Sequence, residues 1–118
     1  RLKALLRRPR TAIAGAAGLV PAGLEVDEGR RQVRVDAEPI ELTALEFDLL
    51  AALAREPGIV VTRARLFDQV WGEGYVAQDH LVDVHIAKVR RKLGDDPADP
   101  RFVETVRGVG YRVREAAR

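Results

Sequence analysis

Beyond residue 18, apolar and polar residues first alternate in short runs that are separated by turn residues. These runs cover residues 23–27, 32–36 and 39–42. Alternation with a period of two is typical of half-buried antiparallel strands, because successive side chains of a strand point to opposite faces. The pattern therefore predicts a small antiparallel meander before the first core helix.

A helical period follows at residues 44–55. Thr43 and Glu46 have the spacing of a capping box, in which each side chain accepts a hydrogen bond from the backbone N–H of the other residue. The segment "EPG" that comes next contains proline and glycine, which end helices. The side of this helix that we expect to be buried carries Leu45, Leu49, Leu50 and Leu53.

Two further helices and a hairpin are expected in the second half of the chain. Residues 59–61 can form one short strand, and Thr62 is a suitable N-cap for a helix over 63–71. A third helix is predicted over 79–93, and residues 101–113 are typical of two strands around a glycine-containing turn. The inward positions of the second helix are Leu66, Phe67 and Val70.

The third predicted helix has two unlike sides. On a helical wheel with about 100° per residue, one apolar stripe lies within about 40°. Its members are Val82, Ile86, Val89 and Leu93. The opposite side combines small or apolar residues with cations and contains no acid; it presents His80, Leu81, Val84, Ala87, Lys88 and Arg91. Taken alone, this face favours an ordinary solvated surface, and only its context in the chain favours a surface for a polyanion.

Composition narrows the class of protein. The 118 residues include 47% hydrophobic and 32% charged side chains, which suits one globular domain with a modest core. Cysteine is absent, which excludes disulfides and thiolate zinc sites. Apolar runs fall far short of a bilayer span and no signal peptide opens the chain, so we expect a cytoplasmic protein without a membrane anchor.

The charges and the chain organisation point to a polyanionic partner. Residues 1–8 predict a short basic helix and residues 9–17 a loose linker, so the folded domain is expected over 18–118. The net charge is only +2, but the isoelectric point is near 9.4 and the cations gather in the first ten residues, the third helix and the final hairpin. Such clustering favours nucleic acid as a partner.

The predicted elements have the order of a helix-turn-helix with a wing: a short helix, a loop, a longer helix and a basic hairpin. The major groove of DNA admits one helix, whose cations contact phosphates and base edges and whose small apolar groups contact thymine methyls. Arg107, in the turn of the hairpin, suits the minor groove. Trp71 suits the core, a phosphate contact through its indole N–H, or both.

Metal and catalytic sites find little support in the sequence. His80 and His85 lie about 140° apart on the wheel, so one ion cannot bind both from a single helix. The chain has no serine or cysteine to act as a nucleophile, and Thr43 and Thr62 are explained as helix caps. We therefore expect neither an enzyme nor a cofactor.

Four motifs occur in one order along the chain: "LTALEFDLL", "VWG", "VDVHIAKVRRKL" and "TVRGVGY". With them, residues 18–114 resemble the effector domain of OmpR/PhoB-type response regulators of bacterial two-component systems. The resemblance implies an α+β fold, namely a winged helix-turn-helix with an N-terminal antiparallel sheet, three helices and a C-terminal β-hairpin wing. It also implies sequence-specific binding of double-stranded DNA that controls transcription. Residues 1–8 then resemble the end of the last helix of the receiver domain.

The same resemblance assigns roles to individual residues. Base contacts in the major groove would fall to Leu81, Val84 and Lys88, which the helical wheel also places outward. Arg107 would be the wing residue that enters the minor groove. Contacts with the DNA backbone would fall to Trp71, His80, His85, Arg90 and Arg91. The wheel places His85 and Arg90 on the flanks of the helix, where they suit backbone contacts and not base reading.

Partners are implied as well. The segment where relatives contact RNA polymerase consists of Gly72, Glu73, Gly74, Tyr75, Val76, Ala77, Gln78 and Asp79. Phosphorylation of a receiver domain by a histidine kinase would drive dimerisation on tandem half-sites, so the fragment is expected to be monomeric. Relatives often carry polar or basic residues at the positions of His80, Leu81 and Ala87, which leaves the base preference open. A winged helix that binds another protein is the alternative function.

Overall fold

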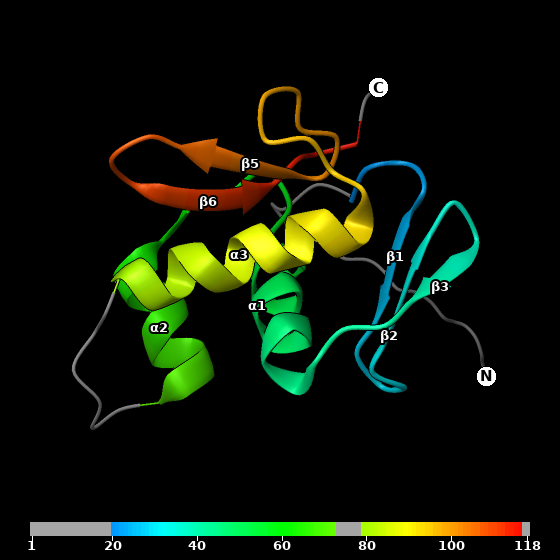
Figure 1. The fold of residues 1–118 in the computed structure, drawn as a ribbon, viewed down its shortest axis with the longest axis horizontal. Coiled ribbons are helices and arrows are strands. Elements are labelled where there is room, and N and C mark those ends of the chain that lie inside the picture. The colour runs from blue at the N-terminus through cyan, green and yellow to red at the C-terminus, as the bar shows by residue number, and fades with distance from the viewer. Residues whose placement is uncertain (1–19, 73–78, 117–118) are drawn as a thin grey trace.

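A computed structural model describes residues 20–72 and 79–116. The elements in chain order are β1 (Leu24–Asp27), β2 (Gln32–Val35), β3 (Glu38–Ile40), α1 (Ala44–Ala54), β4 (Val61–Thr62), α2 (Arg63–Trp71), α3 (Asp79–Leu93), β5 (Val103–Val106) and β6 (Gly110–Val113). Figure 1 shows the first sheet at one end of the molecule and the β5–β6 hairpin running alongside α3. This is the expected α+β winged-helix arrangement. The basic segment 1–8 and the linker 9–17 lie outside the described residues.

The N-terminal sheet is antiparallel, with its strands in the order β1-β2-β3. The register pairs Leu24 with Val35 and Val33 with Ile40, so the apolar residues of all three strands share one face. Leu24 and Val33 are buried in the core. The predicted meander is therefore confirmed, and its apolar face is what joins it to the helices.

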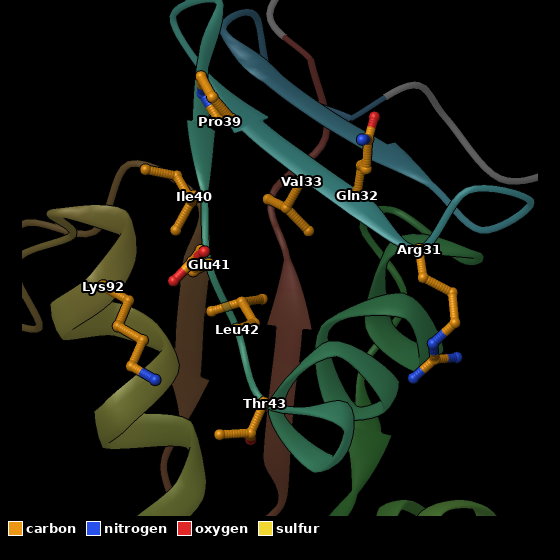
Figure 2. A pocket seen from close by; sticks show the side chains of 9 residues that line it. All are labelled: Arg31, Gln32, Val33, Pro39, Ile40, Glu41, Leu42, Thr43 and Lys92. Atoms are coloured by element: carbon orange, nitrogen blue, oxygen red, sulfur yellow. The ribbon is translucent and has the colours of Figure 1, made fainter.

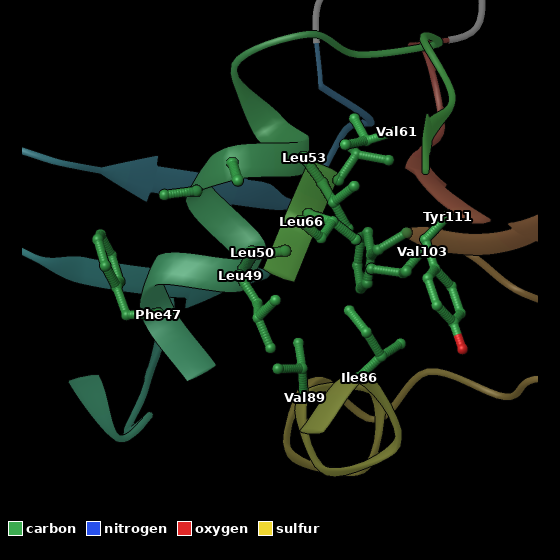
Figure 3. Close-up of a cluster of buried hydrophobic side chains, with 14 of the residues drawn as sticks. Phe47, Leu49, Leu50, Leu53, Val61, Leu66, Ile86, Val89, Val103 and Tyr111 are labelled. Atoms are coloured by element: carbon green, nitrogen blue, oxygen red, sulfur yellow. The ribbon is translucent and has the colours of Figure 1, made fainter. Parts of the chain in front are cut away.

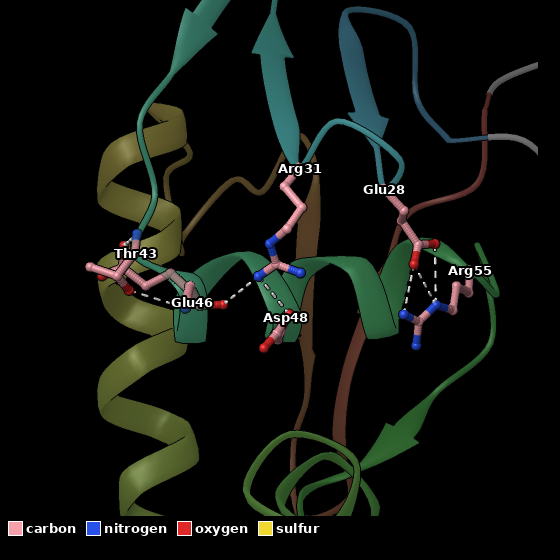
Figure 4. A network of polar contacts seen from close by, with 7 residues as sticks. Glu28, Arg31, Thr43, Glu46, Asp48 and Arg55 are labelled. Carbon is pink, nitrogen blue, oxygen red and sulfur yellow. Dashed lines mark hydrogen bonds and ion pairs between the residues drawn. The ribbon is translucent and has the colours of Figure 1, made fainter.

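Helix α1 begins at the predicted capping box. The Thr43 hydroxyl accepts a hydrogen bond from the Glu46 backbone N–H at 3.2 Å, and the Glu46 carboxylate accepts one from the Thr43 N–H at 3.0 Å (Figure 4). Lys92 of α3 donates to the same carboxylate at 2.7 Å. Burial raises the pKa of the Glu46 carboxyl, but these hydrogen bonds outweigh burial and hold the pKa below its usual value.

Helix α1 is also the centre of the hydrophobic core. It contacts α2, α3 and β6, and Figure 3 shows its leucines pointing toward α3 and the second sheet. Leu49, Leu50 and Leu53 have no exposed surface, as predicted, whereas Leu45 is only half-buried. In α2 the Thr62 cap is present; Leu66 and Phe67 are buried and Val70 is half-buried.

The second sheet has the strand order β4-β6-β5, so the hairpin is joined by a third strand. Val61 pairs with Tyr111 and Thr62 with Gly110. A side chain at Gly110 would clash with the backbone of Val61 and Thr62, which explains why glycine stands there. The sequence predicted the hairpin and a short strand over 59–61, of which only Val61 lies in β4. It did not predict that these strands form one sheet.

Candidate nucleic-acid interface

Helix α3 has the two sides that the wheel predicted. The inner stripe is buried throughout and consists of Val82, Ile86, Val89 and Leu93. On the outer side His80, Ala87, Lys88 and Arg91 are exposed, whereas Leu81 and Val84 are half-buried. Leu81 packs against the edge of the core. The outer face therefore offers cations and one small residue fully to a partner, and its larger apolar groups only in part.

Arg90 is buried, contrary to its predicted contact with the DNA backbone. Its side chain is only 7% exposed and lies against the wing instead of the surface. Its guanidinium donates to the Val103 carbonyl at 3.1 and 3.3 Å and to the Thr105 hydroxyl at 2.5 Å. Because these internal acceptors occupy the head group, Arg90 fastens α3 to β5. The side chain is therefore not available for the predicted contact with the DNA backbone.

Trp71 and His85 form one aromatic cluster with Phe67 beside α3. The Trp71 ring stacks on Phe67 with centroids 4.8 Å apart, and its distance to the His85 ring is 5.6 Å in an edge-on arrangement. His85 Nδ1 lies 2.8 Å from the Leu81 carbonyl oxygen, which can only accept, so this nitrogen carries the hydrogen. A contact from Nε2 to a phosphate therefore requires a doubly protonated, cationic imidazole.

The tip of the wing presents Arg107 to solvent. Arg107 is exposed, and Gly108 beside it has a φ of 76°, the left-handed conformation that closes the turn. Below the tip, Glu104 and Arg112 face each other across the β5–β6 pair, with Nε and Oε1 2.6 Å apart. The structure thus places the predicted minor-groove residue at the exposed end of a paired hairpin.

A polar junction that the sequence analysis missed connects α2, α3 and β6. Asp83 Oδ1 accepts hydrogen bonds from Arg63 Nε at 2.9 Å and from the Tyr111 hydroxyl at 2.6 Å. Burial and the neighbouring carboxylate raise the pKa of Tyr111 to about 12, so the phenol stays neutral and keeps donating. Only the helical spacing of Asp83 was visible in the sequence, because its partners come from distant segments.

A groove elsewhere on the molecule carries no comparable chemistry. Figure 2 shows it between the N-terminal sheet and the end of α3, lined by Arg31, Gln32, Val33, Pro39, Ile40, Glu41, Leu42, Thr43 and Lys92. Its two cations are already paired, Arg31 with Asp48 at 2.9 Å and Lys92 with Glu46 at 2.7 Å. The cations of this groove are therefore neutralised by acids of the protein itself.

The predicted polymerase segment is described only at its two ends. Gly72 caps α2 with a φ of 93°, and α3 begins at Asp79. Residues 73–78 between them lie outside the described part of the chain. Within the described ranges, no three His, Asp or Glu side chains converge to hold a metal ion, and no helix has the length and apolarity to cross a membrane.

Residues 37–113 match the sequence profile of the family described as "Transcriptional regulatory protein, C terminal". The chain belongs to this family. The match confirms the resemblance to OmpR/PhoB-type effector domains, and it places the chain among transcriptional regulators and not among enzymes. The profile covers α1, α2, α3 and the wing, so it includes every residue of the outer face discussed above.

Relatives of this effector domain include mycobacterial regulators. It is 45% identical over 116 residues to the sensory transduction protein RegX3 of Mycolicibacterium smegmatis, covering 96% of this chain and 51% of the relative. It is 50% identical over 91 residues to the DNA-binding response regulator MtrA of Mycobacterium tuberculosis, covering 77% and 40%. The chain thus spans about half the length of the curated relatives it matches, or less.

Solved structures of the same family share the fold. The effector domain resembles the Klebsiella pneumoniae RstA DNA-binding domain in complex with the RstA box, with a TM-score of 0.74 and 33% identity over 81% of this chain and 95% of that one. It also resembles the DNA-binding domain of CpxR from E. coli, with a TM-score of 0.70 and 37% identity over 86% and 100%.

Proposed function

We propose that this effector domain binds double-stranded DNA in a sequence-specific manner, with α3 in the major groove and the wing in the minor groove. The observation that carries the proposal is the outer face of α3, where Lys88 and Arg91 are exposed beside small residues while the opposite stripe is wholly buried. A helix of this kind fits the major groove, and the similar RstA domain was solved with a DNA box.

Within this proposal, the residues have separate tasks. Leu81, Val84 and Lys88 read base edges, and Arg107 enters the minor groove. Leu81 and Val84 have apolar side chains that are half-buried. Their contribution to base reading is therefore contact with thymine methyls. Contacts with the DNA backbone fall to Trp71, His80 and Arg91 at the margin of the face. His85 joins them only with a cationic imidazole, because its Nδ1 hydrogen is donated to Leu81.

The larger protein around this domain is part of the proposal. Names of the relatives favour a response regulator, in which a receiver domain and a histidine kinase control the effector domain. Two copies would then occupy tandem half-sites, and the isolated domain would be a cytoplasmic monomer that binds weakly. Residues 72–79 would contact RNA polymerase.

The alternative, a module that binds another protein through Leu81 and Val84, has less support. Both side chains are half-buried, so the apolar patch that they offer is small. Binding of a protein partner that does not weaken with salt would favour this alternative, because contacts with DNA phosphates weaken steeply with salt.

The test is selection of duplexes from a randomised library by the 118-residue chain at a fixed salt concentration, repeated with Lys88→Ala. We expect one enriched motif for the unmodified chain. For Lys88→Ala we expect a blurred motif and a loss of about 1–3 kcal/mol of discrimination between cognate and random DNA. Motif repeats spaced by about one helical turn would support tandem binding.

Lys92→Gln is the matched control, because it removes the same charge from the same helix while its amide can still donate to Glu46. It should weaken cognate and random DNA alike and leave the motif sharp. Salt-dependent retention of DNA without any enriched motif would contradict sequence-specific reading. Equal losses on cognate and random DNA for Lys88→Ala would contradict the role of that residue.

A further inference from the structure

The junction around Asp83 has an unusual place on the molecule. Asp83 lies on the flank of α3 that turns toward β6, about 100° around the helix from Val84, and its carboxylate is 40% exposed. Phosphates repel a carboxylate, so an acid on a helix that faces DNA weakens binding unless it supplies something else. What it supplies here is an acceptor for donors from two other elements, Arg63 of α2 and Tyr111 of β6.

The hydroxyl of Tyr111 ties the wing directly to α3. The ring reaches from β6 toward the helix, and its hydroxyl donates to Asp83 at 2.6 Å (Figure 3). Two guanidinium carbons lie near the ring centroid, that of Arg90 at 5.4 Å and that of Arg63 at 6.0 Å. Cations near an aromatic ring are attracted to its face, so these arginines hold the ring in place.

Arg90 makes a second tie two turns further along the same helix. Asp83 and Arg90 are seven residues apart, which corresponds to about 10 Å along the axis and nearly the same direction around it. Arg90 donates to Val103 and Thr105 of β5, while Asp83 accepts from β6. Two separated ties, one to each strand of the hairpin, fix the wing against both sliding and rotation relative to α3.

We propose that Asp83 and Tyr111 are positioning residues that hold α3 and the wing at one fixed angle, so that Lys88 and Arg107 enter neighbouring grooves of one duplex together. The inference rests on the proposed function. Its physical basis is pre-organisation: a reading surface whose parts are already aligned does not spend binding free energy on ordering them. Arg63 extends the same junction to the start of α2.

The first test is a double-mutant cycle with Tyr111→Phe and Arg107→Ala in the 118-residue chain. Tyr111→Phe keeps the ring but removes the tie. We expect cognate binding to weaken roughly threefold to tenfold, because binding must then order the loosened wing. In the Tyr111→Phe background, Arg107→Ala should then cost much less than in the unmodified chain, because a loosened wing no longer delivers its arginine. Additive losses would overturn the inference.

Asp83→Asn is a second variant. The direction of its effect on DNA binding distinguishes a positioning role from simple repulsion between Asp83 and phosphates. Removal of an acid near phosphates strengthens binding to all DNA if charge alone matters. We expect instead that the ratio of cognate to random affinity falls, because the weaker amide acceptor loosens both donors. An unchanged or higher ratio would overturn the inference.

Glu104→Gln is the matched control for this variant. It also removes one acid, but its partner Arg112 lies within the wing and not on α3. This variant should leave the ratio of cognate to random affinity unchanged. Thermal unfolding of each variant identifies a temperature at which all are folded, and binding is compared there. Absence of a selected motif for the unmodified chain would overturn the proposed function and this inference together.

Discussion

Helices α1 and α3 both contribute to the core, but they are exposed to solvent very differently. Seven of the eleven residues of α1 are buried, including the charged Glu46. In α3 the buried hydrophobic residues form a single stripe, and most of the opposite side is open to solvent. A helix surrounded by protein on nearly all sides supports the fold, whereas a helix with one free side is available to a partner.

The polar anchors of the two helices differ in the same way. At the start of α1, the Glu46 carboxylate accepts a bond from its own cap (Figure 4). It also accepts one from Lys92, which closes the helix end. In α3 the polar anchors, Asp83 and Arg90, reach the wing. Helix α1 therefore holds the domain together, while the anchors of α3 fix its orientation relative to the wing.

The largest effect that tests this division is expected from Leu50→Ala in α1. Leu50 is completely buried, so its truncation removes apolar contacts and leaves a cavity. We expect the free energy of unfolding to fall by about 2–5 kcal/mol. Chemical denaturation measures this loss, and the selected DNA motif should remain the same at a temperature where the variant is folded.

Lys88→Ala in α3 should show the opposite pattern to Leu50→Ala, with an effect on DNA reading and little effect on stability. Lys88 is exposed, so its loss should change the free energy of unfolding by no more than about 0.5 kcal/mol while the DNA motif blurs. A blurred motif for Leu50→Ala, or a large loss of stability for Lys88→Ala, would show that the two helices share both tasks.

An effect of intermediate size on the free energy of unfolding is expected when alkaline pH ionises Tyr111, at the junction between α3 and the wing. The pKa of Tyr111 is raised to about 12, above the value near 10 of an unfolded chain, so the folded protein holds this proton more tightly. The stabilisation is complete below pH 10 and is lost as the pH rises from about 10 to about 12. It amounts to at most about 2 kcal/mol, since water partly screens the Asp83 partner.

Tyr111→Phe isolates this contribution from the titration of lysines, which falls in the same range. Denaturation of both proteins between pH 8 and 12 should show a smaller decline for the variant. Parallel declines would mean that the phenol contributes no pH-dependent stability and that α3 is held to the wing by packing and by Arg90.

The smallest effect is expected from Arg55→Gln at the end of α1. Arg55 forms a two-pronged ion pair with Glu28 of the β1–β2 turn, with its closest N–O distance at 2.7 Å, but both side chains are about half exposed. Such pairs contribute about 0.2–1 kcal/mol and weaken with salt. A larger loss, or one that persists in 1 M salt, would show that α1 depends on its surface pairs and not only on its core.

The sequence predicted those features that depend on neighbouring residues. Helix α3 was predicted over its observed length, and its buried stripe was correct, because a helical period is visible within one segment. The caps Thr43 and Thr62 were also correct, since each acts on a backbone N–H three residues away.

The missed features all depend on contacts between distant segments. Arg90 was assigned to DNA because its buried acceptors, Val103 and Thr105, lie in a different element. Asp95 was not singled out in the sequence, although its buried carboxylate accepts hydrogen bonds from the backbone N–H groups of residues 101–103 and shapes the entry to β5. No local pattern marks such an acceptor.

The pairing of β4 with β6 affects when the domain can fold during its synthesis. Thr62 both pairs with Gly110 and caps α2, so the start of the helix-turn-helix is fastened to the last described strand. That strand leaves the ribosome after every other described element. Until it emerges, Val61 and Thr62 lack the neighbours that complete their sheet, and the chain between these segments must close into a loop before that sheet can form. The support that β6 gives to the start of α2 is therefore absent until β6 itself has been synthesised.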